Sequence, residues 1–143
     1  MALPHTWRPF GVRVAGTVLG LGLVLVCALA WLGFDDATRA RFTLFQRGTL
    51  LFFGLLGFAL WFALVRSRVV AEERGLVVVN GYRRREYAWA QVVAVHMPAG
   101  APWVTLDLTD GTTVSAMGIQ GSDGDRARAA VRELRRLVDQ RAH

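Results

Sequence analysis

The sequence predicts an α+β protein: a two-helix transmembrane hairpin followed by a small antiparallel β-barrel or sheet capped by a C-terminal α-helix. Three observations predict this class. The first half contains two long stretches without a charged residue, and short β-branched runs separated by turn residues follow them. The chain then ends in one amphipathic stretch.

Each uncharged stretch is long enough to cross a bilayer. Residues 14–34 and 48–65 form helices of roughly 31 and 27 Å at about 1.5 Å per residue, against about 30 Å of hydrocarbon. The rest of the chain is too short to wrap two helices that are apolar on every side. We therefore expect a cytoplasmic N-terminus (1–13), two transmembrane helices (14–34 and 48–65), an extracytoplasmic loop (35–47) and a folded domain (66–143).

The first span also has features of a signal peptide. Arg8 and Arg13 precede the apolar run, and Ala28, Leu29 and Ala30 have the A-x-A form of a cleavage site. A cleaved first span leaves the second as a stop-transfer segment, and a retained one makes a hairpin. Both alternatives leave the C-terminus on the same side of the membrane.

The distribution of arginine indicates which side that is. All 17 basic residues are arginine, and the formal net charge is +6. The loop between the spans holds three of them, whereas two precede the first span and six follow the second within residues 66–85. Because basic residues favour the cytoplasmic side, we expect a multi-pass protein of the inner (plasma) membrane with its C-terminal domain in the cytoplasm.

Small residues in the spans predict how the helices pack. Gly16 and Gly20 form a small-xxx-small pair, and Gly54 and Gly57 present a flat face on the second span. We interpret these four glycines as contacts of a helical hairpin, with a homodimer as an extension of the same packing.

The C-terminal domain begins after the second span. Runs rich in β-branched residues predict strands at 69–71, 76–79, 92–96, 104–108 and 114–117. Asn80 and Gly81 predict one hairpin, since both residues tolerate positive φ. For the hairpin at Asp110 and Gly111 we expect a three-residue loop (109–111), which pairs Leu106 with Val114 and Val104 with Ala116.

The last stretch predicts a helix over about residues 123–141. Ala127, Val131, Leu134 and Val138 recur at helical spacing. Ser122 followed by Asp125 resembles a capping box, and we assign Asp123 and Asp125 to helix capping rather than to a calcium site, since the segment lacks further acidic ligands.

This domain resembles the bacterial PH-like domain of small actinobacterial membrane proteins, the low molecular weight protein antigen 6 family. The run GLVVVNG, Trp89 before a valine-rich strand, Pro102 with Trp103, and the segment 118–120 carry the resemblance. It covers nearly the whole chain, spans included. The resemblance implies a PH-like barrel with a C-terminal helix and no established catalytic activity.

The arginine triplet is the main candidate site. Along a strand, Arg83 and Arg85 lie on one face with Tyr87 and Trp89, and Arg84 lies on the other face with Glu86. Three interpretations remain open: a solvated edge strand, nonspecific contact with an anionic membrane surface, and a specific phospholipid pocket. Trp103 is a second candidate contact, or a cover for the sheet edge.

Nothing in the sequence identifies a reaction. The single cysteine, Cys27, lies in the first span, and we expect no catalytic residue, metal site, cofactor or nucleic-acid partner. The favoured hypothesis is a non-enzymatic, membrane-anchored interaction module that docks a membrane or cytoplasmic protein, or rests on anionic headgroups of the inner leaflet. The alternative is an accessory subunit of a membrane transporter or cell-envelope enzyme.

Overall fold

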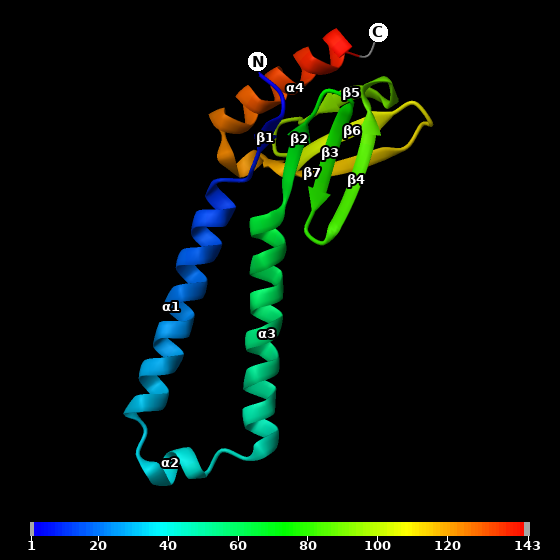
Figure 1. The fold of residues 1–143 in the computed structure, drawn as a ribbon. Helices are drawn as coiled ribbons and strands as arrows, with labels where there is room; N and C mark the ends of the chain where they lie inside the picture. The colour runs from blue at the N-terminus through cyan, green and yellow to red at the C-terminus, as the bar shows by residue number, and fades with distance from the viewer. Residues whose placement is uncertain (1, 142–143) are drawn as a thin grey trace.

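The computed structural model describes residues 2–141 as a long helical hairpin joined at its open end to a small α+β domain (Figure 1). The hairpin consists of α1 (Gly11–Gly33), a short α2 (Asp36–Ala40) and α3 (Leu44–Arg66). The two long helices have mean hydropathies of 2.3 and 2.2, and no residue of either is buried. Both are long and apolar enough to cross a membrane, and neither is the buried core helix of a globular domain.

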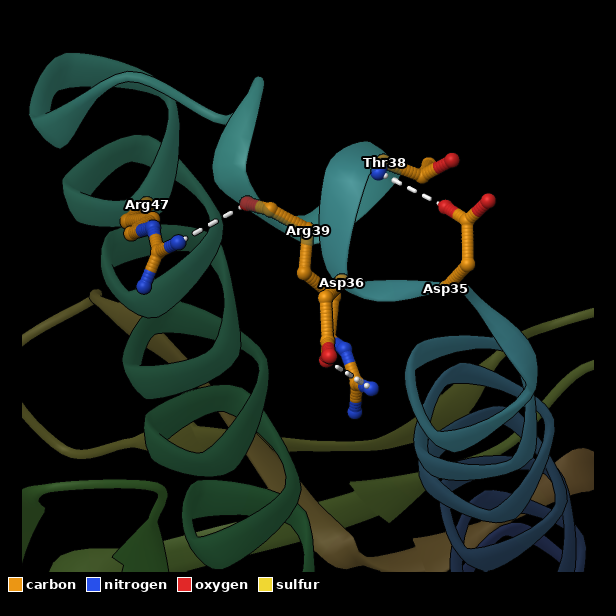
Figure 2. Close-up of polar contacts among 5 residues, drawn as sticks. All are labelled: Asp35, Asp36, Thr38, Arg39 and Arg47. Carbon is orange, nitrogen blue, oxygen red and sulfur yellow. Dashed lines mark hydrogen bonds and ion pairs between the residues drawn. The ribbon is translucent and has the colours of Figure 1, made fainter.

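Polar contacts order the turn between these helices (Figure 2). Asp35 caps α2 by accepting the Thr38 backbone N–H at 2.7 Å, and hydrogen bonding from the Thr38 side chain and backbone lowers the pKa of Asp35. The Arg47 guanidinium donates to the Arg39 carbonyl oxygen at 2.8 Å and lies 5.3 Å from the centre of the Trp31 ring. Two of the three arginines in this loop therefore serve its local structure.

Apart from the contact of Arg47 with Trp31 at the turn, the long helices meet near the domain. Trp61 donates its indole N–H to the Thr17 hydroxyl at 2.9 Å, and a Cβ added to Gly16 would lie 3.9 Å from Leu64. Toward α2 the helices diverge (Figure 1), and Cβ atoms added at Gly20, Gly54 and Gly57 would meet nothing within 4 Å. Of the four glycines, only Gly16 faces the other helix within the chain. Packing of the remaining three against a second copy stays a prediction.

The domain contains two antiparallel sheets that do not close into a barrel. Trp89 lies in the turn between the sheets, buried, and its indole N–H donates to the Glu72 carbonyl oxygen at 2.9 Å. The helix α4 (Asp125–Arg141) packs against the second sheet. The first sheet contains β1 (His5–Trp7), β2 (Arg68–Ala71), β3 (Gly75–Asn80) and β4 (Arg83–Ala88), and the second contains β5 (Val92–His96), β6 (Trp103–Leu108) and β7 (Thr113–Gln120).

One core joins the sheets to the helix. Leu76 and Val78 of β3, Leu106 of β6 and Leu134 of α4 are all at most 2% exposed and belong to one cluster. The apolar positions predicted for β3, β6 and the C-terminal helix therefore form the core. The alternation predicted for β6 reflects one buried face, whereas the uninterrupted apolar run of β3 is buried on both faces.

The strand β1 was not predicted from the sequence. It pairs with β2 from His5↔Ala71 to Trp7↔Val69, and Trp7 is 8% exposed in the core. Its indole N–H donates to the Glu133 carboxylate of α4 at 3.1 Å. Only a few residues separate β1 from α1, and one residue separates α3 from β2. Each long helix is therefore connected to a strand of the same sheet without a long linker.

The second hairpin has the predicted register, and the first does not have the predicted turn. Leu106 pairs with Val114 and Val104 with Ala116, which confirms the three-residue loop. In the first hairpin Asn80 is the last residue of β3 and pairs with Arg83, so the loop consists of Gly81 and Tyr82. Gly81 has φ +62°, as a type II′ turn requires at its first position.

Asn80 instead joins the two sheets. Its side-chain amide donates to the Ser115 carbonyl oxygen at 2.6 Å, and its amide oxygen accepts the Met117 N–H at 2.9 Å. The side chain thus supplies the donor and the acceptor that the backbone of an adjacent strand would supply to β7 in a closed barrel. It satisfies one C=O and one N–H group of β7.

The start of α4 also differs from the expectation. The helix begins at Asp125 after a 3₁₀ turn, η2 (Gly121–Asp123). Asp123 does not cap this helix: its carboxylate accepts the backbone N–H groups of Phe10 at 2.9 Å and Gly11 at 2.7 Å. It therefore caps α1, a role that no local sequence pattern reveals because the cap comes from the other end of the chain.

We predict that Asn80→Ala lowers the unfolding free energy of the domain by about 1–3 kcal/mol, because two backbone groups of β7 lose their partner. Asn80→Asp keeps an acceptor for the Met117 N–H, so its unfolding free energy should lie between those of Asn80→Ala and the wild type. Thermal unfolding of the full chain in detergent micelles measures both. Thr113→Ala, at an exposed position of β7, is the control, and equal stability of all four proteins would contradict the bridge.

Candidate functional site

The tip of the β3–β4 hairpin is bound to the side of α3. The Tyr82 hydroxyl donates to the Ala59 carbonyl oxygen at 2.5 Å, and the Arg66 guanidinium lies 5.5 Å from the centre of the Tyr82 ring. The Gly81 N–H donates to the Ser67 hydroxyl at 2.9 Å. The residue Tyr82 was not singled out in the sequence; its position directly after a glycine at a hairpin tip is the signal that identifies it.

This contact sets the height of the arginine triplet along α3. Ala59 precedes Arg66 by seven residues, which is about 10 Å along a helix axis. A strand rises about 3.3 Å per residue, so Arg85 lies about 10 Å from Tyr82 along β4. In Figure 1 the tip of the hairpin lies beside the end of α3, and its strands continue beyond the helix. Through β3, however, Arg84 lies level with Arg68 and Arg85 with Val69 of β2, so the triplet begins at the end of α3 and continues beyond it.

The three arginines divide between the two faces of β4. Arg83 and Arg85 pair with Asn80 and Val78 of β3, on the face that bears the core residues. Arg84 lies on the opposite face and forms an ion pair with Glu86 at 2.7 Å. Within residues 2–141, Arg83 and Arg85 have no acidic partner, so their charges are available to an anion.

The expected position of Trp89 on this face is wrong. Trp89 lies in the 3₁₀ turn η1 (Trp89–Gln91) and is 4% exposed. The strand ends at Ala88, whose N–H donates to the Gln91 side-chain oxygen at 2.7 Å. The side chain of Gln91 thus terminates the strand and the chain turns inward.

The strand β4 forms an edge of its sheet. In the sheet order it has β3 as its one neighbour among the described residues. In a hairpin with a two-residue loop, the residues that flank the loop, here Asn80 and Arg83, form a hydrogen-bonded pair, and every second pair after it does the same. The backbone N–H and C=O groups of Arg83 and Arg85 therefore point toward β3. The N–H and C=O groups of Arg84 and Glu86 therefore point away from the sheet.

The structure does not combine Trp103 with the triplet. Trp103 begins β6 in the other sheet, where it pairs with Gln120 beside a β-bulge. Its side chain is half-buried, which agrees better with covering the sheet end than with a free contact residue. Whether Trp103 meets a partner stays a prediction.

Two polar contacts in the second sheet are local to it. His96 lies 2.6 Å from the Asp107 carboxylate on the outer face of β5 and β6. Hydrogen bonding from the Thr112 side chain and backbone lowers the pKa of Asp110 and closes the β6–β7 turn. In the described part of the chain no three His, Cys, Asp or Glu side chains gather as a metal site would require. The arrangement at the hairpin suits binding of anions.

The order of elements, seven antiparallel strands in two sheets followed by one packed helix, defines a PH-like domain carried on a helical hairpin. The chain belongs to the bacterial PH domain family, whose model matches residues 66–137. It is 30% identical over 138 residues to Uncharacterized protein Rv1417 of Mycobacterium tuberculosis and to Uncharacterized protein Mb1452 of Mycobacterium bovis. Each alignment covers 94% of this chain and 85% of the relative. No solved structure matches the sequence.

We predict that Tyr82→Phe loosens the hairpin tip by about 0.5–1.5 kcal/mol through loss of one hydrogen bond, and that Tyr82→Ala loosens it further. Hydrogen exchange of residues 76–88 in the full chain measures the change. Tyr87→Phe on the same strand is the matched control. Unchanged exchange in Tyr82→Ala would show that the tip is not held by α3.

Proposed function

We propose that the protein is a membrane-anchored, non-enzymatic interaction module whose PH-like domain rests on anionic headgroups of the cytoplasmic leaflet through the β3–β4 hairpin. The observation that carries this proposal is the hydrogen bond from Tyr82 to Ala59. It joins the basic strand to an apolar helix at a defined height. On a flexible linker the basic strand would have no fixed position along the axis of α3.

The height agrees with the layers of a bilayer. With Arg66 at the headgroups, Tyr82 reaches about 10 Å deeper, the region where amphipathic aromatic rings collect in membrane proteins. Arg83 and Arg85 then follow at and just beyond the level of Arg66, where long side chains can reach the headgroup phosphates. Each contributes about 1 kcal/mol on an anionic surface, which orients the domain while the spans anchor it.

The arginine distribution supports the orientation, and β1 supports a shared side for the two ends of the described chain. Because β1 and β2 pair, the N-terminus lies on the same side as the domain. Cleavage after Ala30 would remove β1 and take Trp7 from the core, so a retained first span is the better interpretation. In the opposite loop, Arg39 and Arg47 are engaged in local contacts. We therefore propose a cytoplasmic domain.

The edge strand supports a second candidate function, docking of a protein partner. The outward N–H and C=O groups of Arg84 and Glu86 can pair with an extended segment, as in β-strand addition. A partner that is a transporter or an envelope enzyme would make this chain its accessory subunit. Charged side chains on the edge act against unspecific pairing, so such a partner needs acidic residues opposite Arg83 and Arg85.

The lipid function is tested with the full chain in nanodiscs. We expect slower hydrogen exchange of residues 76–88 in phosphatidylglycerol than in phosphatidylcholine, and loss of this difference at high salt. The triple variant Arg83→Gln/Arg84→Gln/Arg85→Gln should show no difference between the lipids.

The triple variant Arg128→Gln/Arg132→Gln/Arg136→Gln removes the same charge from exposed positions of α4 and should retain the wild-type response. If the wild type exchanges equally in both lipids, the hairpin does not contact the headgroups. If both triple variants lose the difference in exchange between the two lipids to the same extent, the response depends on net charge alone.

The orientation has its own test. Single cysteines replacing Arg41 in the loop and Arg132 on α4, in a Cys27→Ser background, should react differently with an impermeant thiol reagent on intact cells. We expect labelling at position 41 and protection at position 132. Labelling at position 132 would reverse the proposed topology.

A further inference from the structure

We propose a second lipid site, distinct from the β3–β4 hairpin: a groove between β1, β7 and the start of α4 that binds the phosphate headgroup of an anionic phospholipid through Arg8 and Arg126. The proposal rests on the membrane location proposed above. It uses residues at opposite ends of the chain, which the fold brings together.

The groove is a concave surface with room for a headgroup. Its lining comes from three elements: His5, Thr6 and Arg8 at β1, Gly118 and Ile119 of β7, and Arg126 of α4. Its volume is about 250 Å³. A water molecule takes about 30 Å³ in the liquid, so the groove accommodates about eight groups of that size, roughly a phosphate with part of its glycerol.

The charges of the groove favour an anion. Arg8 and Arg126 are exposed, and neither forms an ion pair within residues 2–141. Asp123 also lines the groove, but both of its oxygens already accept the N–H groups of Phe10 and Gly11. This carboxylate is thereby engaged by the start of α1 and does not need an arginine. Two guanidinium groups with free N–H donors remain, and their fork geometry suits phosphate.

A cation–π contact holds one of these arginines in position. The Arg126 guanidinium lies 4.6 Å from the centre of the Phe10 ring. This contact uses no hydrogen bond, and within residues 2–141 the Arg126 N–H groups have no acceptor, so they are free to donate. Phe10 is itself 53% exposed at the beginning of α1. An ordered arginine loses less conformational entropy on binding than a mobile one.

The groove lies where a headgroup would be found. Its lining residue Arg126 contacts Phe10, directly before α1, and the uncharged stretch begins at Val14. Val14 and Val18 are 48% and 63% exposed on α1. A phospholipid with its phosphate between Arg8 and Arg126 can therefore lay its acyl chains along α1. Free phosphate offers the same anionic oxygens but gains nothing from this apolar surface.

The test is native mass spectrometry of the full chain released from nanodiscs of equal phosphatidylglycerol and phosphatidylcholine. We expect wild-type protein to retain phosphatidylglycerol in preference. Arg8→Gln/Arg126→Gln should retain it at least about ten-fold less, the factor for losing one charge-assisted hydrogen bond. Arg132→Gln/Arg136→Gln removes two charges from exposed positions of the same helix and should behave as wild type.

Further arms separate the possible outcomes. Unfolding temperature and helix content must match among the variants, and Arg8→Lys/Arg126→Lys, which keeps the charge, should recover part of the retention. Equal retention by wild type and Arg8→Gln/Arg126→Gln overturns the proposal. Displacement of the lipid by millimolar inorganic phosphate would identify free phosphate as the ligand and also overturn it. The variant Arg83→Gln/Arg84→Gln/Arg85→Gln should still retain phosphatidylglycerol in the groove. A failure of the groove proposal can therefore be told apart from a failure of the hairpin proposal.

Discussion

The pairing of β1 with β2 is the interaction on which the rest of the structure depends. It places the residues before α1 and the residues after α3 on neighbouring strands, so both apolar helices enter the domain at one sheet. Trp7 completes the core from β1, and Asp123 caps α1 from the other side. These contacts replace the flexible linker that usually separates a membrane anchor from its domain. The domain consequently has one position and one orientation relative to the helices.

The helical hairpin has little internal structure by comparison. The helices meet at Gly16, Thr17 and Trp61 and diverge toward α2 (Figure 1). Their arrangement is therefore set at its two ends, by the sheet at one end and by the capped turn around Arg47 at the other (Figure 2). Apolar helices have no hydrophobic drive to associate within lipid, so end constraints of this kind decide their geometry. The exposed helix faces remain available to lipid or to other helices.

The attachment of the domain to the helices also fixes where the arginines without an acidic partner lie. A surface arginine with no acidic partner contributes little to folding and indicates no ligand by itself. Here Arg83 and Arg85 are held beside the end of α3 by Tyr82, and Arg126 is held beside the start of α1 by Phe10. In both places an aromatic residue near a helix end makes the local contact, at the hairpin tip in one case and at the guanidinium itself in the other. The family comparison supports an interaction module in general, and these local contacts supply the proposed chemistry.

The sequence by itself determined the features that depend on neighbours along the chain. Uncharged length predicted both helices, β-branched runs predicted five strands, and alternation predicted the register of the β6–β7 hairpin. Only the tertiary structure decided what β1, Asn80, Tyr82 and Asp123 do, because each acts on a partner more than 20 residues away. A three-residue strand has no period to detect, and an asparagine before a glycine has the same local pattern whether it forms the turn or joins two sheets. The candidate arginines of β4 could be named from the sequence, but their height beside α3 could not, since it depends on that distant contact.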